Sequence, residues 1–227
     1  MDHKIYSVAI DGPAGAGKST IARRAAERLQ FVYVDTGAIY RTVGYAACCR
    51  GIALDEPEKI AALLPELTVA LRWTEDGLQH MLLNGQDVTA EIRHPEISTY
   101  ASVCAAVPEV RAFLLNTQRE VAKTHSVVMD GRDIGTVVLP DADVKIFLTA
   151  SAEVRARRRF LELQAKGAPD PYETVLADMV ERDQRDSGRA IAPLRQADDA
   201  VLVDTSALTL EQSIDTVVRV ILERIKL

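Results

Sequence analysis

Gly12-Pro-Ala-Gly-Ala-Gly-Lys-Ser-Thr20 is the stretch that decides the fold, and it follows the apolar run Ile5–Ile10. It matches the phosphate-binding loop pattern, a glycine, four residues and then Gly-Lys-Ser, without a mismatch. Glycines let backbone N–H groups converge on a phosphate chain, and the helix that follows adds the positive end of its dipole. The sequence therefore predicts a nucleoside triphosphate site, lined by Gly12, Pro13, Ala14, Gly15, Ala16, Gly17, Lys18, Ser19 and Thr20.

The last residues of this loop carry specific chemistry. In loops of this type the lysine reaches the β- and γ-phosphates, and the serine hydroxyl ligates Mg²⁺. An ordinary glycine-rich turn between a strand and a helix has no need for Lys-Ser at its end. We therefore expect Lys18 to take part in catalysis and Ser19 to bind the metal.

Composition excludes several classes of protein. The 227 residues are 48% hydrophobic and 26% charged, as in a globular protein of one sizeable domain. A net charge of −6 argues against a surface that coats nucleic acid. No run of 18 apolar residues and no signal-peptide pattern is present, so we expect a cytoplasmic protein. Cys48, Cys49 and Cys104 lack paired spacing and are expected to be reduced, mostly buried and free of metal.

Apolar runs alternate with amphipathic segments along most of the chain. This alternation predicts an α/β fold, with a parallel five-stranded sheet and helices on both faces. The expected strands are Ile5–Ile10, Phe31–Val34, Ser126–Met129, Val144–Leu148 and Ala200–Val203. The expected helices are Ser19–Gln30, Ala38–Cys49, Val110–Lys123, Ala152–Ala165 and Leu210–Ile225.

One region breaks the alternation. Leu67–Thr74, Gln79–Leu83 and Gln86–Glu91 read as short strands around Asp76-Gly77 and Asn84-Gly85. Both dipeptides favour tight hairpin turns because their residues tolerate positive φ. The sequence therefore predicts a small antiparallel insert at about residues 65–94.

Polar residues follow two of the expected strands. Asp35-Thr-Gly-Ala-Ile-Tyr-Arg41 begins a helix that Thr36 or Gly37 is able to cap, with either a ligand-binding or a solvated Arg41. Asp130-Gly-Arg-Asp133 ends a fully apolar strand. Ligands in parallel sheets bind beyond the carboxyl ends of strands, which favours ligand contact here over a tight charged turn.

Arginines cluster in the second half of the chain. One expected helix carries Arg155 and Arg157–Arg159, ahead of a loop at Lys166–Pro171. Farther on, Arg182, Asp186 and Arg189 have the spacing of one helix face. Such residues either form a solvated face, pair internally or bind phosphates, for which the planar guanidinium fork is well suited.

Four motifs together resemble the bacterial-type cytidylate kinases, within the nucleoside monophosphate kinases. They are I-D-G-P-A-G-A-G-K-S-T, D-T-G-A-I-Y-R, V-M-D-G-R-D-I-G-T-V-V and R-D-Q-R-D-S-G-R-A-I-A-P-L, in this order. The resemblance covers essentially the whole chain, and the predicted hairpin insert resembles the family's monophosphate-binding region.

The resemblance implies transfer of the γ-phosphoryl group of ATP to CMP or dCMP, with Mg²⁺. It implies catalytic roles for Lys18, Arg132 and Arg189, an ATP contact for Arg158, and Arg41, Arg132 and Arg189 around the acceptor phosphate. Ser102, Arg111 and Asp133 would lie near cytosine, and Arg182 and Asp186 near the ribose. The remaining expected substrate contacts are Thr36 and Tyr40.

The same resemblance implies a single kinase domain. Its core would comprise about residues 1–64, 95–151 and 187–227, with the insert at 65–94 and a lid at 152–186. We expect a monomer that binds small nucleotides and neither nucleic acid nor membrane. Another small-molecule kinase, for UMP, AMP or shikimate, is the nearest alternative. A regulatory GTPase is less compatible because no Asn-Lys-x-Asp string occurs.

Overall fold

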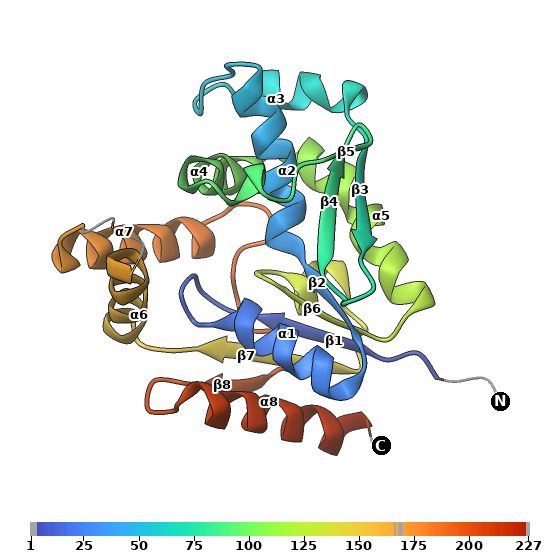
Figure 1. Ribbon diagram of the computed structural model, residues 1–227, viewed down its shortest axis with the longest axis vertical. Coiled ribbons are helices and arrows are strands. Elements are labelled where there is room, and N and C mark those ends of the chain that lie inside the picture. Colours follow the sequence, from blue (N-terminus) through green and yellow to red (C-terminus); the bar gives the residue numbers. More distant parts are fainter. Residues whose placement is uncertain (1–3, 166, 168–169, 226–227) are drawn as a thin grey trace. The chain divides into compact units, whose positions relative to one another are not determined.

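A computed structural model describes residues 4–165, 167 and 170–225 of the chain. It contains a five-stranded sheet of order β2-β6-β1-β7-β8 and a three-stranded sheet of order β3-β4-β5 (Figure 1). The first sheet consists of β1 (Ser7–Asp11), β2 (Val32–Asp35), β6 (Val127–Gly131), β7 (Val144–Thr149) and β8 (Val201–Asp204). The expected parallel sheet with helices on both faces is confirmed.

The chain divides into two compact units, which we describe separately. The first unit comprises Met1–Ile5, of which residues 4 and 5 are described, and Val32–Val127. The second unit comprises Tyr6–Phe31 and the described residues of Val128–Leu227, the last of which is Ile225. No helix within the described residues is both long and apolar enough to cross a membrane.

In the second unit, β1 pairs in parallel with β7, and β7 with β8. Ile10 and Ile146 face each other in register and are fully buried, so the sheet centre is apolar. The helices are α1 (Lys18–Leu29), α6 (Ala152–Ala165), α7 (Tyr172–Ser187) and α8 (Leu210–Ile225), with the π-helical turn η3 (Ile134–Val138). Helices α1 and α8 pack together, and α6 packs on α7 (Figure 1).

In the first unit, the long α2 (Thr36–Cys49) packs mainly against α4 (Pro95–Cys104). This contact is close at Gly44, where a Cβ atom would lie 3.0 Å from the backbone nitrogen of Ala101. The other helices are α3 (Pro57–Leu63) and α5 (Pro108–Thr124), with 3₁₀ turns η1 (Leu64–Glu66) and η2 (Glu91–Arg93).

The antiparallel sheet confirms the predicted hairpins. It comprises β3 (Val69–Trp73), β4 (Gln79–Leu83) and β5 (Gln86–Asp87), and the turn residues Asn84 and Gly85 both have positive φ. The third strand is shorter than predicted, because Asp87 Oδ1 accepts hydrogen bonds from the backbone and hydroxyl of Thr89 and the chain then enters η2.

The cysteines are free thiols, but Cys49 is exposed and Cys48 half-buried, so only Cys104 matches the predicted burial. Burial raises the pKa of Cys104 to about 12. The predicted loop at Lys166–Pro171 includes Lys166, Ala168 and Pro169, which lie outside the described residues.

Candidate active site

The phosphate-binding loop joins β1 to α1 in the second unit. Gly12 has φ +153°, and a Cβ atom there would lie 1.9 Å from the carbonyl oxygen of Leu148, so no other residue fits. Lys18 is the first residue of α1 and is buried, with its Nζ donating to the carbonyl of Pro13 at 2.7 Å. Burial lowers the pKa of Lys18 well below its ordinary value, and the positive charge of Arg132 lowers it further. The negative charges of Asp130 and Asp11 oppose this lowering of the pKa but do not reverse it.

Ser19 lies beside a carboxylate that sequence reasoning did not assign to the metal. Its hydroxyl donates to Oδ2 of Asp130, which is buried at the end of β6, at 3.0 Å. A hydroxyl and a carboxylate are the hard oxygen ligands that Mg²⁺ takes from proteins, with phosphates and water completing its shell. Ser19 and Asp130 therefore fit a magnesium ion carried by a nucleotide. No group of three or more His, Cys, Asp or Glu residues suited to a metal occurs among the described residues.

Asp11, the last residue of β1, fixes the turn that follows β6. Its two carboxylate oxygens accept hydrogen bonds from the backbone N–H groups of Ile134 at 2.8 Å and Gly135 at 2.7 Å. Desolvation raises the pKa of Asp11 to about 6, although the two N–H donors oppose this change. Because Arg132 and Asp133 directly precede these two residues, Asp11 positions both of them. No local sequence pattern indicates this pairing across more than one hundred residues.

Asp186 of α7 contacts two arginines of the second unit, Arg132 and Arg189. It accepts from Arg132 Nε at 2.8 Å and forms an ion pair with Arg189. Burial alone would raise the pKa of Asp186, but the positive charges of Arg132, Arg189 and Arg182 outweigh it and hold the pKa low. The prediction that Arg189 lies on one helix face with Arg182 and Asp186 is wrong, because α7 ends at Ser187. Beyond the helix, the backbone N–H of Leu194 donates to the carbonyl of Asp186.

A pocket of about 290 Å³ adjoins the start of α1 in the second unit. It is lined by Gly17, Thr20, Ile21, Arg158, Leu208, Leu210 and Ser213. Arg158 is held at its edge because its guanidinium donates to the hydroxyl and the carbonyl of Thr205, at 3.2 and 2.8 Å. Arg158 therefore lines the same pocket as Gly17 and Thr20 of the phosphate-binding loop.

The Arg155 guanidinium, in contrast, makes its hydrogen bonds to groups of the protein itself. It donates to the carbonyls of Ala14 and Ala150 and to both carboxylate oxygens of Asp183, and so links the phosphate-binding loop to α7. Arg157 is exposed and Arg159 pairs with Glu162 at 2.9 Å, which matches the solvated-face alternative for these two residues.

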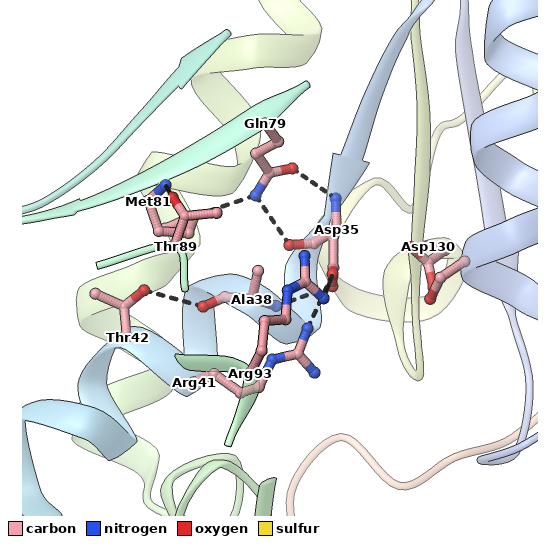
Figure 2. A network of polar contacts seen from close by, with 10 residues as sticks. Asp35, Ala38, Arg41, Thr42, Gln79, Met81, Thr89, Arg93 and Asp130 are labelled. Atoms are coloured by element: carbon pink, nitrogen blue, oxygen red, sulfur yellow. Dashed lines mark hydrogen bonds and ion pairs between the residues drawn. The ribbon is translucent and has the colours of Figure 1, made fainter. Parts of the chain in front are cut away.

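The first unit holds a second cluster of charges at the start of α2 (Figure 2). Asp35, not Thr36 or Gly37 as predicted, caps this helix: β2 ends at Asp35, whose Oδ1 accepts from the backbone N–H of Ala38 at 2.8 Å. Its other oxygen, Oδ2, accepts from Arg41 at 2.9 Å and from Arg93 at 3.4 Å. The alternative of a solvated Arg41 is therefore wrong, since its side chain is only 19% exposed.

The hairpin sheet fixes Asp35 from the other side. Gln79 of β4 accepts from the backbone N–H of Asp35 at 2.7 Å and donates to its carbonyl at 3.2 Å (Figure 2). Trp73 of β3 donates to the carbonyl of Tyr33 at 3.1 Å. The insert therefore holds the junction between β2 and α2 in place.

Other predicted substrate residues of the first unit are also buried. The Arg111 guanidinium carbon lies 5.8 Å from the centre of the Tyr40 ring, and its Nη1 donates to the carbonyl of Ala105. The Ser102 hydroxyl is buried and has no hydrogen-bond partner among the described residues, so a bound ligand would be able to supply one. Thr36 is buried at the first position of α2.

Comparison with known proteins decides the family. The family model for cytidylate kinase matches residues 8–223. The chain belongs to the cytidylate kinase family. It is 47% identical to a cytidylate kinase of Shouchella clausii strain KSM-K16, over 97% of both chains. It is 52% identical to one from Leuconostoc mesenteroides subsp. mesenteroides, over 94% of this chain and 93% of that one.

One solved structure supports the fold of this cytidylate kinase family member without bearing on its chemistry. An uncharacterized protein from Eubacterium ventriosum ATCC 27560 has a TM-score of 0.52 at 12% identity, over 94% of this chain and 96% of that one.

The predicted residues of this family member are divided between the two units. Thr36, Tyr40, Arg41, Ser102 and Arg111 lie in the first unit. The second unit contains Lys18, Ser19, Arg132, Asp133, Arg158, Arg182, Asp186 and Arg189. Sequence reasoning did not identify the contacts of Asp11 with Ile134, of Arg93 with Asp35 or of Asp130 with Ser19. Asp11 and Asp130 shared one signal in the sequence, since each lies at the end of an apolar strand.

Proposed function

We propose that this chain transfers the γ-phosphoryl group of ATP to CMP or dCMP, giving ADP and CDP or dCDP. Membership in the cytidylate kinase family supports this activity. The observation that carries it in the structure is the buried Lys18 of an intact phosphate-binding loop, with Arg132 and Asp130 as its electrostatic neighbours. Charges of this kind suit the phosphates of a nucleotide.

The donor site belongs to the second unit. In the proposal, residues 12–20 wrap the phosphates, Lys18 neutralises the group in transfer, and Arg158 borders the pocket for the donor base. Ser19 and Asp130 would hold the Mg²⁺ of the nucleotide. When bound, this ion neutralises phosphate charge and fixes the phosphate conformation.

Membership in the cytidylate kinase family also suggests the contacts of the acceptor. Arg41, Arg132 and Arg189 are proposed to bind its phosphate, Ser102, Arg111 and Asp133 its base, and Thr36 and Tyr40 neighbouring atoms. Arg182 and Asp186 are proposed for the ribose. Cytosine has an N4 amino donor beside N3 and O2 acceptors, so a carboxylate next to an arginine or hydroxyl suits it, whereas the O4 of uracil would meet a carboxylate unfavourably.

The chemistry asks little of the protein beyond alignment and neutralisation of charge. The acceptor is already a phosphate oxygen, so no general base is required. Lys18, Arg132 and Arg189 act by stabilising the negative charge that spreads over the moving phosphoryl group. Asp11 and Asp186 keep Arg132 in a fixed position and so reduce the reorganisation that transfer requires.

We further propose that residues 152–186 form the lid and residues 65–94 the monophosphate-binding insert of one kinase domain, active as a monomer. Arg155 supports the lid because it ties α6 and α7 to the phosphate-binding loop. Met179 of α7 also lies against this loop, since a Cβ atom on Gly15 would come within 3.0 Å of its methyl group. A lid in this place excludes water that would otherwise hydrolyse ATP.

A thermal-shift panel tests the proposal. The wild-type protein and Lys18→Ala would be heated with ATP and Mg²⁺, and separately with CMP, dCMP, UMP, AMP, GMP and shikimate. Saturating ligand stabilises by mass action, by about 2.7 kcal/mol at one hundred times its Kd. We expect CMP and dCMP to give the largest acceptor shifts, and Lys18→Ala to lose only the ATP shift. A larger shift with AMP, UMP or shikimate would contradict the proposed acceptor.

A further inference from the structure

Arg93 is an arginine to which no role has been given so far. It ends the 3₁₀ turn η2, between the hairpin sheet and α4, and its guanidinium lies 3.4 Å from Oδ2 of Asp35 (Figure 2). Its side chain is 56% exposed, so a ligand in solution is able to reach it. Arg93 shares Asp35 with Arg41, which the proposed function assigns to the acceptor phosphate.

The charges of this cluster do not balance. Asp35 contributes one negative charge, and Arg41 and Arg93 contribute two positive ones. Oδ1 of Asp35 is already used by the backbone N–H of Ala38, so each guanidinium shares only Oδ2. The Nε atom of Arg41 is buried and has no hydrogen-bond partner among the described residues. An anion would therefore supply both the missing charge and the missing acceptor.

The cluster is also held rigidly. Gln79 bonds to the backbone of Asp35 on both sides, and the side chain of Asp35 caps α2, so its carboxylate has a fixed direction. Gly37 leaves the space that Arg41 occupies, because a Cβ atom there would lie 3.3 Å from Nη1 of Arg41. The positive end of the α2 dipole favours an anion at the same place. A fixed pair of guanidinium forks suits the oxygens of a phosphate.

We propose that Arg93 binds the phosphate of the acceptor nucleotide together with Arg41, and that Asp35 holds the two guanidiniums in position for it. This inference rests on the proposed function. It adds a binding residue supplied by the segment after the hairpin sheet. Asp35 is then a positioning residue, which touches the arginines and not the nucleotide.

A simpler alternative is that Arg93 only neutralises Asp35, and the chain offers a matched control for it. Arg72 of β3 has a side chain that is 59% exposed and an ion pair of 3.5 Å with Asp87. Its exposure and ion-pair distance nearly equal those of Arg93, and it lies in the same unit. Arg72→Ala therefore removes the same charge and a similar ion pair from a place with no proposed ligand.

Calorimetric titration with CMP and with cytidine, which lacks the phosphate, tests the proposal on the full chain. We expect Arg93→Ala to weaken CMP binding by roughly 10- to 100-fold, the effect of losing a charge-assisted contact. Cytidine affinity should stay at the wild-type value. Arg93→Lys should recover part of the loss, because lysine restores the charge without the fork. Arg72→Ala should bind both ligands like the wild type.

Three results would overturn the role of Arg93: unchanged CMP affinity in Arg93→Ala, equal weakening of CMP and cytidine, or an equal effect of Arg72→Ala. Melting temperatures of the unliganded variants identify a loss caused by unfolding, and Arg93→Lys then serves as the test variant. A wild-type protein that does not prefer CMP over the other acceptors would contradict the proposed function instead, so the two failures are distinguishable.

Discussion

Asp35 in the first unit and Asp186 in the second each hold two arginines, but the two clusters differ in depth. Around Asp186, the side chains of Arg132 and Arg189 are 20% and 7% exposed. Around Asp35, Arg41 is similarly covered, whereas Arg93 is more than half exposed. The deeper cluster joins a helix to the turn after β6, so its ion pairs also support the fold. The shallower cluster leaves the side chain of Arg93 available to a ligand.

We expect the largest difference between the two clusters in the free energy of unfolding that is lost when each aspartate is removed. Asp186→Ala leaves a buried Arg189 without its carboxylate, and we expect a loss of about 3–5 kcal/mol in the free energy of unfolding. Asp35→Ala loses a helix cap and partly exposed ion pairs, for which we expect about 1–2 kcal/mol. Urea denaturation without ligand measures both values. Equal losses would show that burial does not distinguish the clusters.

Replacement of one arginine from each cluster should affect activity similarly but stability differently. Arg41→Ala and Arg189→Ala should each lower kcat/KM for CMP by about 10²- to 10³-fold, because both are proposed to neutralise phosphate charge. Arg189→Ala should also lower the unfolding midpoint, whereas Arg41→Ala should lower it little. Steady-state kinetics and thermal melts of the same preparations provide the comparison. If activity per folded molecule survives in either variant, that arginine is a structural ion-pair partner.

Asp11 differs from both aspartates above, because backbone N–H groups and not arginines bind its buried carboxylate. Its pKa of about 6 lies above the ordinary value of 3.8, so the folded state binds the proton more tightly than the unfolded state. Protonation therefore favours folding, and Asp11 removes stability as the pH rises from about 4 to 6. Between pH 4.5 and 7.5 the wild type should lose about 2 kcal/mol relative to Asp11→Asn. A difference that does not change with pH would contradict the raised pKa.

Gly37→Ala should give the smallest effect, with opposite signs for folding and binding. Alanine within a helix stabilises by up to about 1 kcal/mol relative to glycine. The added methyl group would nevertheless lie 3.1 Å from Oδ1 of Asp35 and 3.3 Å from Nη1 of Arg41, so that both side chains would shift by a few tenths of an ångström. We expect an unchanged or higher melting temperature and a roughly tenfold weaker CMP affinity. Unchanged affinity would mean that the position of Arg41 tolerates this shift.

The sequence predicts the regular elements of the parallel sheet well. Each expected strand agrees within two residues with β1, β2, β6, β7 and β8, because buried parallel strands are continuous apolar runs. The short α3 and α4 were not predicted, since neither is long enough to carry an extended amphipathic pattern.

The sequence predicts the local part of the candidate site but not the contacts between residues that lie far apart in the chain. Residues 12–20 form a local motif, so their role is read directly from the sequence. Arg158 and the arginines around Asp186 needed the family resemblance. Asp11 with Ile134 and Arg93 with Asp35 pair across 123 and 58 positions, and such contacts arise only from the fold.

ADP formation measured in a coupled assay, with ATP, Mg²⁺ and each of CMP, dCMP, UMP, AMP, GMP and shikimate as acceptor, tests the central claim most directly. We expect the highest kcat/KM for CMP or dCMP and a value for UMP lower by about 10³-fold, because a carboxylate that matches the cytosine amino group leaves uracil unpaired. A higher kcat/KM for UMP, AMP or shikimate than for CMP would contradict it.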